Sequence, residues 1–183
     1  MKILLCIGGA SGSIYGIRLL EELKKAGVET HLIVSEGAKK IVEHETNYKF
    51  VDLKKLASYC YDNSDIFAGP ASGTFKLDAM IICPCSMKTL SAVANGYCDT
   101  LTSRAAFCIL KEEQKLILVP RETPMPLPAI KNMEKSRLAG ATILPAMPGF
   151  YHKPKKIDDL VDFIVGKILD QLEIKHTLFK RWE

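Results

Sequence analysis

The amino-acid sequence predicts one α/β domain in which a parallel β-sheet is covered by helices on both faces. Apolar runs rich in β-branched residues, such as residues 3–7 and 30–34, are typical of strands buried on both sides of a parallel sheet. They alternate with segments whose apolar residues recur at helical spacing, which favours strand–helix–strand units. A length of 183 residues is sufficient for one such domain, so we expect residues 1–183 to form a single unit.

The same patterns predict each element in chain order, with glycine and proline marking the turns. The first half predicts a strand at residues 3–7, a helix ending near Gly27, a strand at 30–34, a helix through 38–42 toward Glu45, a short helix near 53–57, a short strand at 59–61 and a loop at 67–73. The second half predicts a strand at residues 79–83, a helix opening at 86–89, a helix over 100–113, a strand at 115–119, a loop at 121–126, a helix over about 129–138, a strand at 141–144, a loop at 145–151 and a closing helix from Ile157 to Leu172. About residues 174–183 form a tail that we expect to pack on a neighbouring subunit, because its lone Trp182 is typical of a subunit contact.

The turn after the first strand carries the first functional signal. Amides at the start of a helix attract an anion, and Gly9 and Gly12 allow a ligand to approach the main chain. The glycine spacing departs from the dinucleotide fingerprint, and Ser35 follows the second strand where an acidic residue would bind a ribose, although the adjacent Glu36 keeps that contact open. The turn therefore favours a mononucleotide over a dinucleotide. The alternative is a turn that only lets strand and helix pack.

Unusual residues also gather where the other predicted strands end. The carboxyl ends of parallel strands meet at one edge of the sheet, and ligands bind there near a switch in strand order. Five strand ends carry small, hydroxyl-bearing or charged residues that can share one crevice: residues 9–13, Ser35, residues 84–89, residues 121–124 and residues 145–151. The first three supply short donors suited to a phosphorylated planar cofactor.

Charged residues near this crevice suggest a reaction. Glu122 stands beside Arg121 and before two prolines, and it is the best candidate for a general acid or base; the alternative is an ordinary exposed carboxylate. Cations of the second half, together with the Tyr151 hydroxyl, are able to hold a second phosphate in place of a metal ion, the alternative being a solvated basic face. These cations are Arg104, Lys111, Arg121 and Lys167.

The composition excludes several classes of protein. The formal net charge of +4 is too small to indicate nucleic-acid binding. No apolar stretch reaches the roughly 20 residues that span a bilayer, and the N-terminus begins a strand instead of a signal peptide, so we expect a cytoplasmic protein. The six cysteines lie mostly in apolar runs and are expected to be thiols. Cys83 and Cys85 lack the further ligands of a zinc site, and no metal is expected.

Two other patterns suggest different chemistry. Asp158, Asp159 and Asp162 match a D-D-x-x-D pattern able to hold magnesium and a prenyl diphosphate, but they open a predicted helix, where acidic residues favour the dipole. Ser11 lacks the G-x-S-x-G surroundings of a hydrolase nucleophile, and the four histidines are scattered. We therefore favour neither a magnesium site nor a hydrolase.

Taken together, the motifs resemble those of the UbiX-like flavin prenyltransferases (UbiX/Pad), formerly described as aromatic acid decarboxylases. Four ordered motifs carry the resemblance, which extends from Lys2 to Trp182: Gly9-Ala10-Ser11-Gly12 with Tyr15-Gly16, Pro84-Cys85-Ser86-Met87-Lys88-Thr89, Arg121-Glu122-Thr123-Pro124, and Pro145-Ala146-Met147-Pro148-Gly149-Phe150-Tyr151-His152. The resemblance implies a three-layer Rossmann-like or flavodoxin-like domain, assembled as homotrimers in a dodecamer with active sites between subunits.

The resemblance also implies a reaction and a role for each motif residue. The implied enzyme joins a dimethylallyl group from dimethylallyl phosphate to N5 and C6 of reduced FMN, without a metal, and passes prenylated FMN to a partner UbiD-type decarboxylase. Glu122 is the implied proton-transfer group, and Ser11 is a short donor near the flavin ring. FMN is expected on Gly9, Ala10, Ser11, Gly12, Ser35, Ser86, Met87, Lys88, Thr89 and Arg121, and dimethylallyl phosphate on Arg104, Lys111, Tyr151 and Lys167.

Two positions depart from the family pattern. Family members can carry a large aromatic residue where Ile66 stands, which weakens any prediction of π-stabilisation there. They can carry arginine at Lys167, and a lysine binds phosphate as a point charge instead of a two-pronged fork. Two alternatives stay open from the sequence, namely an FMN-dependent decarboxylase of the same fold and a non-catalytic FMN carrier.

Overall fold

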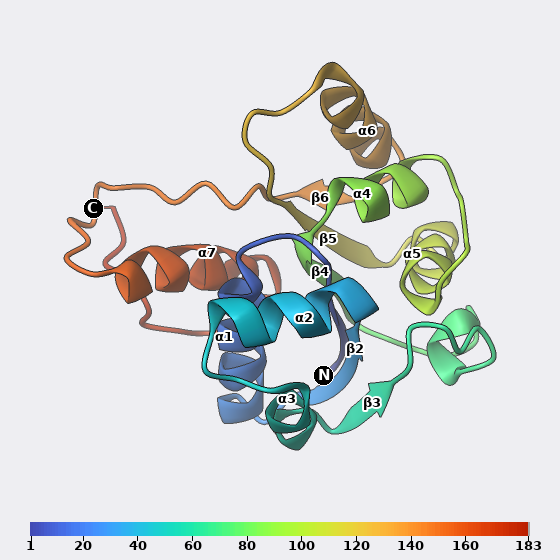
Figure 1. The fold of residues 1–183 in the computed structure, drawn as a ribbon, viewed down its shortest axis with the longest axis horizontal. Coiled ribbons are helices and arrows are strands. Elements are labelled where there is room, and N and C mark those ends of the chain that lie inside the picture. The colour runs from blue at the N-terminus through green and yellow to red at the C-terminus, as the bar shows by residue number, and fades with distance from the viewer. Residues whose placement is uncertain (183) are drawn as a thin grey trace.

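The computed structural model describes residues 1–182 and contains a six-stranded, all-parallel sheet (Figure 1). Glu183, the last residue of the predicted tail, lies outside the described residues. The strand order is β3-β2-β1-β4-β5-β6. The strands are β1 (Lys2–Ile7), β2 (Glu29–Val34), β3 (Tyr59–Tyr61), β4 (Ala79–Cys85), β5 (Lys115–Pro120) and β6 (Thr142–Ile143).

Helices cover both faces of this sheet. One face packs against α1 (Ser13–Lys25), α2 (Glu36–Glu45), α3 (Phe50–Leu56) and α7 (Ile157–Gln171). The opposite face packs against α4 (Met87–Ala94), α5 (Leu101–Lys111) and α6 (Leu127–Leu138). The predicted three-layer α/β fold is thereby confirmed.

The strands are mostly apolar because they supply both layers; in β2, Thr30 and His31 are buried polar exceptions. In β1, Ile3 and Leu5 belong to the core under α1 and α7, whereas Leu4 and Cys6 belong to the core under α4 and α5. Successive side chains of a strand point to opposite faces, so a strand covered on both sides reads as a nearly continuous apolar run. This requirement explains why the strands were predictable from unbroken apolar runs.

The strand order places a crevice at a defined point of the sheet. In a sheet of order 3-2-1-4-5-6, the connections leave β1 and β4 toward opposite faces, and ligands bind outside the carboxyl ends of these two strands. This is the Rossmann-like strand order. The family resemblance had implied either a Rossmann-like or a flavodoxin-like domain, and the strand order favours the first. The residues that follow β1 and β4 are Gly8 and Ser86.

Two glycines near this point are required for packing. The amide of Gly8 donates to the carbonyl of Pro84 at 3.0 Å, and a Cβ at Gly8 would lie 2.5 Å from that oxygen. A Cβ at Gly16 would lie 2.3 Å from the carbonyl oxygen of Cys83. The packing interpretation of the glycine-rich segment is therefore correct for these two positions, while Gly9 is free to serve a ligand.

Most predicted elements are present, with boundaries that differ by a few residues. The loop at 67–73 contains a short 3-10 helix, Gly69–Ala71, that the sequence did not predict. The tail folds back on its own chain: the ring centroid of Phe179 lies 5.0 Å from that of Phe163 on α7, and the ring of Trp182 meets that of Tyr151 edge-on at 5.5 Å. Trp182 is 78% exposed, so its packing on a neighbouring subunit stays a prediction.

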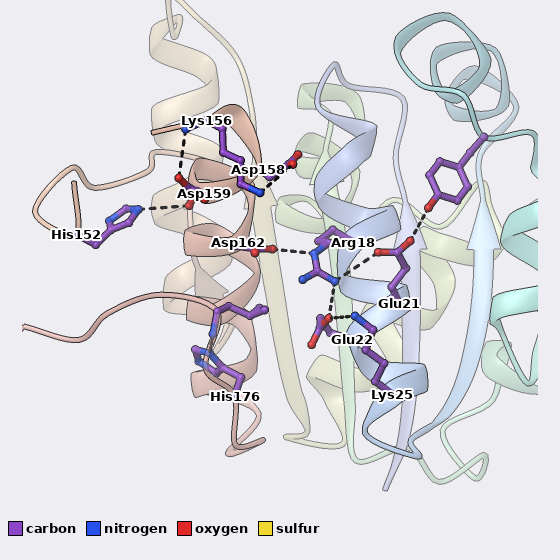
Figure 2. A network of polar contacts seen from close by, with 12 residues as sticks. Arg18, Glu21, Glu22, Lys25, His152, Lys156, Asp158, Asp159, Asp162 and His176 are labelled. Atoms are coloured by element: carbon purple, nitrogen blue, oxygen red, sulfur yellow. Dashed lines mark hydrogen bonds and ion pairs between the residues drawn. The ribbon is translucent and has the colours of Figure 1, made fainter. Parts of the chain in front are cut away.

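The acidic cluster at the start of α7 has structural partners (Figure 2). Asp159 accepts hydrogen bonds from the amides of Lys155 and Lys156, as an acidic residue at a helix start does. Asp162 binds Nε of Arg18 on α1 at 2.7 Å. Within residues 1–182, no three His, Cys, Asp or Glu side chains are grouped so that they could hold a metal ion. No described helix is long and apolar enough to cross a membrane.

Candidate active site

A cavity of about 800 Å³ lies at the switch point of the sheet. Its volume falls within the range of small-molecule sites, which is roughly 300–1,000 Å³. Residues that follow four adjacent strands and residues that open α5 line it: Gly8, Gly9, Ser35, Glu36, Gly37, Asp62, Asn63, Ser64, Ser86, Lys88, Thr89, Ala92, Asp99, Thr100, Thr102 and Ser103. The structure thus brings together Gly9, Ser35, Ser86, Lys88 and Thr89 from the predicted cofactor set.

Three helices begin at this cavity, and each is capped by a hydroxyl. Ser35 caps α2, Ser86 caps α4 and Thr100 caps α5, with each side chain accepting an amide hydrogen bond of 3.2–3.3 Å. Helix starts leave amide groups unpaired and carry a partial positive charge, so their convergence favours an anion. The first-turn amides of α2 and α4 have no acceptor within residues 1–182 and remain available to a phosphate: Glu36, Gly37, Met87 and Lys88.

The carboxylates at the cavity rim are already engaged. Glu36 pairs with Lys39, and Asp62 accepts from the amide and hydroxyl of Ser64. Asp99 lies 3.6 Å from the ammonium group of Lys88. Lysines therefore offset the charge of Glu36 and Asp99, while Asp62 is held by neutral donors and keeps its charge.

The sequence suggested that the turn at the start of α1 binds an anionic ligand, but in the structure this turn binds the Glu45 side chain. The carboxylate of Glu45, at the end of α2, accepts hydrogen bonds from the amides of Gly12 and Ser13, both at 3.0 Å, and from the Ser13 hydroxyl at 2.9 Å. Helix α1 has no acidic residue in its own first turn, and Glu45 supplies that charge. The anion-attracting end of α1 is therefore occupied by the protein itself.

This contact changes the acidity of Glu45. Burial raises the pKa of its carboxyl group, but hydrogen bonds from the Ser11 hydroxyl and from the turn outweigh burial and lower the pKa below its ordinary value of 4.5. A carboxyl whose pKa is lower in the folded state contributes stability that is present above its unfolded pKa and is lost as the pH falls through the folded value.

Replacing Glu45 by Gln should lower the free energy of unfolding by about 1 kcal/mol at pH 7, since the contact is partly exposed to solvent. The difference from the wild type should shrink as the pH falls below 4.5. Urea unfolding at pH 7, 5 and 3 measures it. Glu43→Gln, on the exposed side of the same helix, is the control. A difference that is constant across this pH range would contradict the role of the Glu45 carboxylate.

Arg121 and Glu122 follow β5 and lie beside the α1 turn. Nε of Arg121 donates to the carbonyl of Ser11 at 3.0 Å, which joins two segments that are 110 positions apart. Glu122 is half-buried and accepts from the amide of Thr123 at 3.3 Å. Neither residue lines the cavity. Met87 contributes its side chain to the core instead, which leaves only its amide for a ligand.

The four residues predicted to bind dimethylallyl phosphate are divided between the two faces of the sheet (Figure 1). Arg104 and Lys111 lie on α5, where Nε of Arg104 donates to the carbonyl of Ala71 at 3.0 Å. Tyr151 packs edge-on against Phe163 of α7, and Lys167 lies on that helix. One chain therefore does not bring the four residues together.

Comparison with known proteins agrees with this architecture. The flavoprotein family model matches residues 1–169. A flavin prenyltransferase UbiX from Methanocaldococcus jannaschii is 50% identical over 182 residues, covering 100% of this chain and 98% of the relative. Another from Thauera aromatica is 48% identical, covering 100% of this chain and 94% of that relative. The chain belongs to the UbiX family of flavin prenyltransferases.

Solved structures of UbiX proteins have the same fold as this chain. A crystal structure of AnUbiX (PadA1) in complex with FMN and dimethylallyl pyrophosphate matches with a TM-score of 0.98 at 42% identity, covering 100% of this chain and 97% of that one. A dodecameric protein from Escherichia coli O157:H7, described as an FMN-dependent UbiX-like decarboxylase, matches with a TM-score of 0.98 at 41% identity over the full length of both chains.

Sequence reasoning missed part of this UbiX site. It did not single out Asn63, although a short strand was predicted at residues 59–61, and it did not single out the hydroxyls that open α5, because they follow another helix and not a strand. The position of Asn63 shortly after a short strand was the available signal. Glu45 had no signal, since its contact with the α1 turn bridges 32–33 positions between helices and arises only in the folded chain.

Proposed function

We propose that this protein is a flavin prenyltransferase that transfers a dimethylallyl group to N5 and C6 of reduced FMN, with phosphate as the leaving group. Membership of the UbiX family over the whole chain supports this function. The main structural support is the 800 Å³ cavity, where the starts of three helices converge and favour the phosphate of FMN. The product, prenylated FMN, serves a UbiD-type decarboxylase, and the protein acts in the cytoplasm as a trimer-based dodecamer.

FMN is proposed to place its phosphate against the open amides of α2 and α4. Ser35 and the segment Ser86 to Thr89 then surround the phosphate, and Gly9 allows close approach of the flavin. The segment Ala10 to Gly12 and Arg121 lie beyond the cavity and suit the ring end. The Ser11 hydroxyl donates to Glu45 there and keeps its lone pairs as acceptors for the flavin. Bound reduced FMN supplies the nucleophile.

Dimethylallyl phosphate is proposed to bind at a site shared between subunits. Because α5 and α7 lie on opposite faces of one sheet, Arg104 and Lys111 must come from one chain, and Tyr151 and Lys167 from another, if all four contact one phosphate. Three cations then stabilise the charge that develops on the departing phosphate without a metal ion. The first carbon bond forms at N5 as the carbon–oxygen bond breaks, and N5 gives up its proton to the departing phosphate. Glu122 then protonates the remaining double bond, its tertiary carbon bonds to C6, and Glu122 accepts the proton that C6 releases.

One experiment tests this function directly. The purified protein is incubated under nitrogen with reduced FMN and dimethylallyl phosphate, and the flavin is extracted for mass spectrometry. We expect a flavin whose mass has increased by one dimethylallyl unit. An unchanged flavin beside an active control enzyme would contradict the proposal, as would carbon dioxide release from an aromatic or cysteine-containing acid by the protein alone. Parallel reactions with the monophosphate and the diphosphate identify the donor.

A further inference from the structure

Asn63 connects the loop after β3 to the start of α5. Its side-chain oxygen Oδ1 accepts a hydrogen bond from the amide of Thr102 at 3.1 Å and another from the Thr102 hydroxyl at 2.7 Å. Its main-chain carbonyl accepts from the amide of Leu101 at 2.8 Å. Together with the cap from Thr100, these bonds occupy all three first-turn amides of α5.

These contacts fix the orientation of the Asn63 amide. A backbone N–H can only donate, so the atom facing the Thr102 amide must be the oxygen. The opposite end of the side chain is then an NH₂ group with two donors. That group has no acceptor within residues 1–182, and Asn63 lines the cavity at the switch point.

The three helix starts therefore differ in what they offer a ligand. Helices α2 and α4 each leave their first two amides open, whereas in α5 those two amides are closed by Asn63. In place of the closed amides, the cavity wall at α5 presents the two side-chain donors of Asn63. Donors on three sides match the three terminal oxygens of a phosphate monoester.

We propose that Asn63 is a further flavin-binding residue, whose NH₂ group donates to the phosphate of FMN while its oxygen holds the start of α5. This inference rests on the proposed function, because it takes FMN as the ligand of the cavity. It assigns Asn63 to the phosphate and not to the ribityl chain or the ring.

The substitution Asn63→Asp separates the two ends of the side chain. A carboxylate oxygen replaces Oδ1 and still caps α5, where a negative charge is favourable. The second oxygen replaces the NH₂ group and repels phosphate. We expect FMN affinity to fall about tenfold or more, equivalent to about 1.4 kcal/mol, while riboflavin affinity changes less than about threefold. Flavin fluorescence titrations of the assembled, flavin-free protein measure both affinities.

Asn132→Asp on α6 introduces the same change in charge away from the cavity and is the matched control. Asn63→Ser removes the NH₂ group without adding charge, and its shorter side chain does not extend as far as Oδ1, so it should weaken FMN binding to a smaller extent. If an Asn63 variant lowers the melting temperature, the ratio of its FMN affinity to its riboflavin affinity decides the outcome.

Equal FMN affinity in the wild type and both Asn63 variants would overturn this inference and leave the proposed function intact. Equal losses for FMN and riboflavin would also overturn it, since the contact would then lie on the ribityl chain or ring. A wild-type protein that binds no FMN would contradict the proposed function itself.

Discussion

Glu122→Gln should lower the rate of flavin prenylation by about 100-fold to 10,000-fold, because an amide cannot accept the proton released from C6. FMN affinity should stay within about threefold of the wild type, since Glu122 does not line the cavity. Single-turnover mixing of the FMNH₂-loaded protein with dimethylallyl phosphate, followed by mass analysis of the flavin, gives the rate. Equilibrium titration gives the affinity.

Two comparisons make this result specific to Glu122. Glu134→Gln on the exposed side of α6 makes the same isosteric change and should leave the rate unaltered. A carrier protein that only stores FMN would show no rate in either form, and its FMN affinity would be equal in both. A Glu122→Gln protein that prenylates FMN at the wild-type rate would remove Glu122 from the chemistry.

The sequence predicted the fold because burial imposes a pattern on it. Strands covered on both faces require unbroken apolar runs, as in β1 and β4, and these runs were recognised. The loop helix Gly69–Ala71 was missed because a single 3-10 turn leaves no periodic pattern. Boundaries of α5 and α6 differed by one or two residues, where caps rather than apolar spacing determine the ends.

The site was predictable where it follows a strand and not where it depends on tertiary contacts. Ser35 and Ser86 were found because each lies at the end of an apolar run and opens a helix. The Glu45 contact with the α1 turn was not found, since it joins the far end of α2 to a turn before α1. For the same reason, no pattern in the sequence indicated that Arg104 and Lys167 lie on opposite faces of the sheet.

That separation leads to the second large effect. Arg104→Gln and Lys167→Gln should each lower the prenylation rate by about 100-fold or more, because each removes a cation from the departing phosphate. FMN affinity should be retained in both variants, since neither residue lines the cavity. In an assembly of Arg104→Gln chains alone, every site lacks the arginine. In an assembly of Lys167→Gln chains alone, every site lacks the lysine.

Assemblies that contain both variants should recover activity. If Arg104 and Lys167 reach one phosphate from different chains, half of the sites receive an intact arginine and half of those an intact lysine, so random mixing at equal amounts restores about one quarter of the wild-type rate. If both residues came from the same chain, every chain would carry one defect and no site would be repaired. Co-expression of differently tagged variants, purification through both tags and measurement of the rate per subunit distinguish the two cases. A rate no higher than that of the single variants would place both residues in one chain and require α5 and α7 of that chain to reach a common phosphate around the sheet edge.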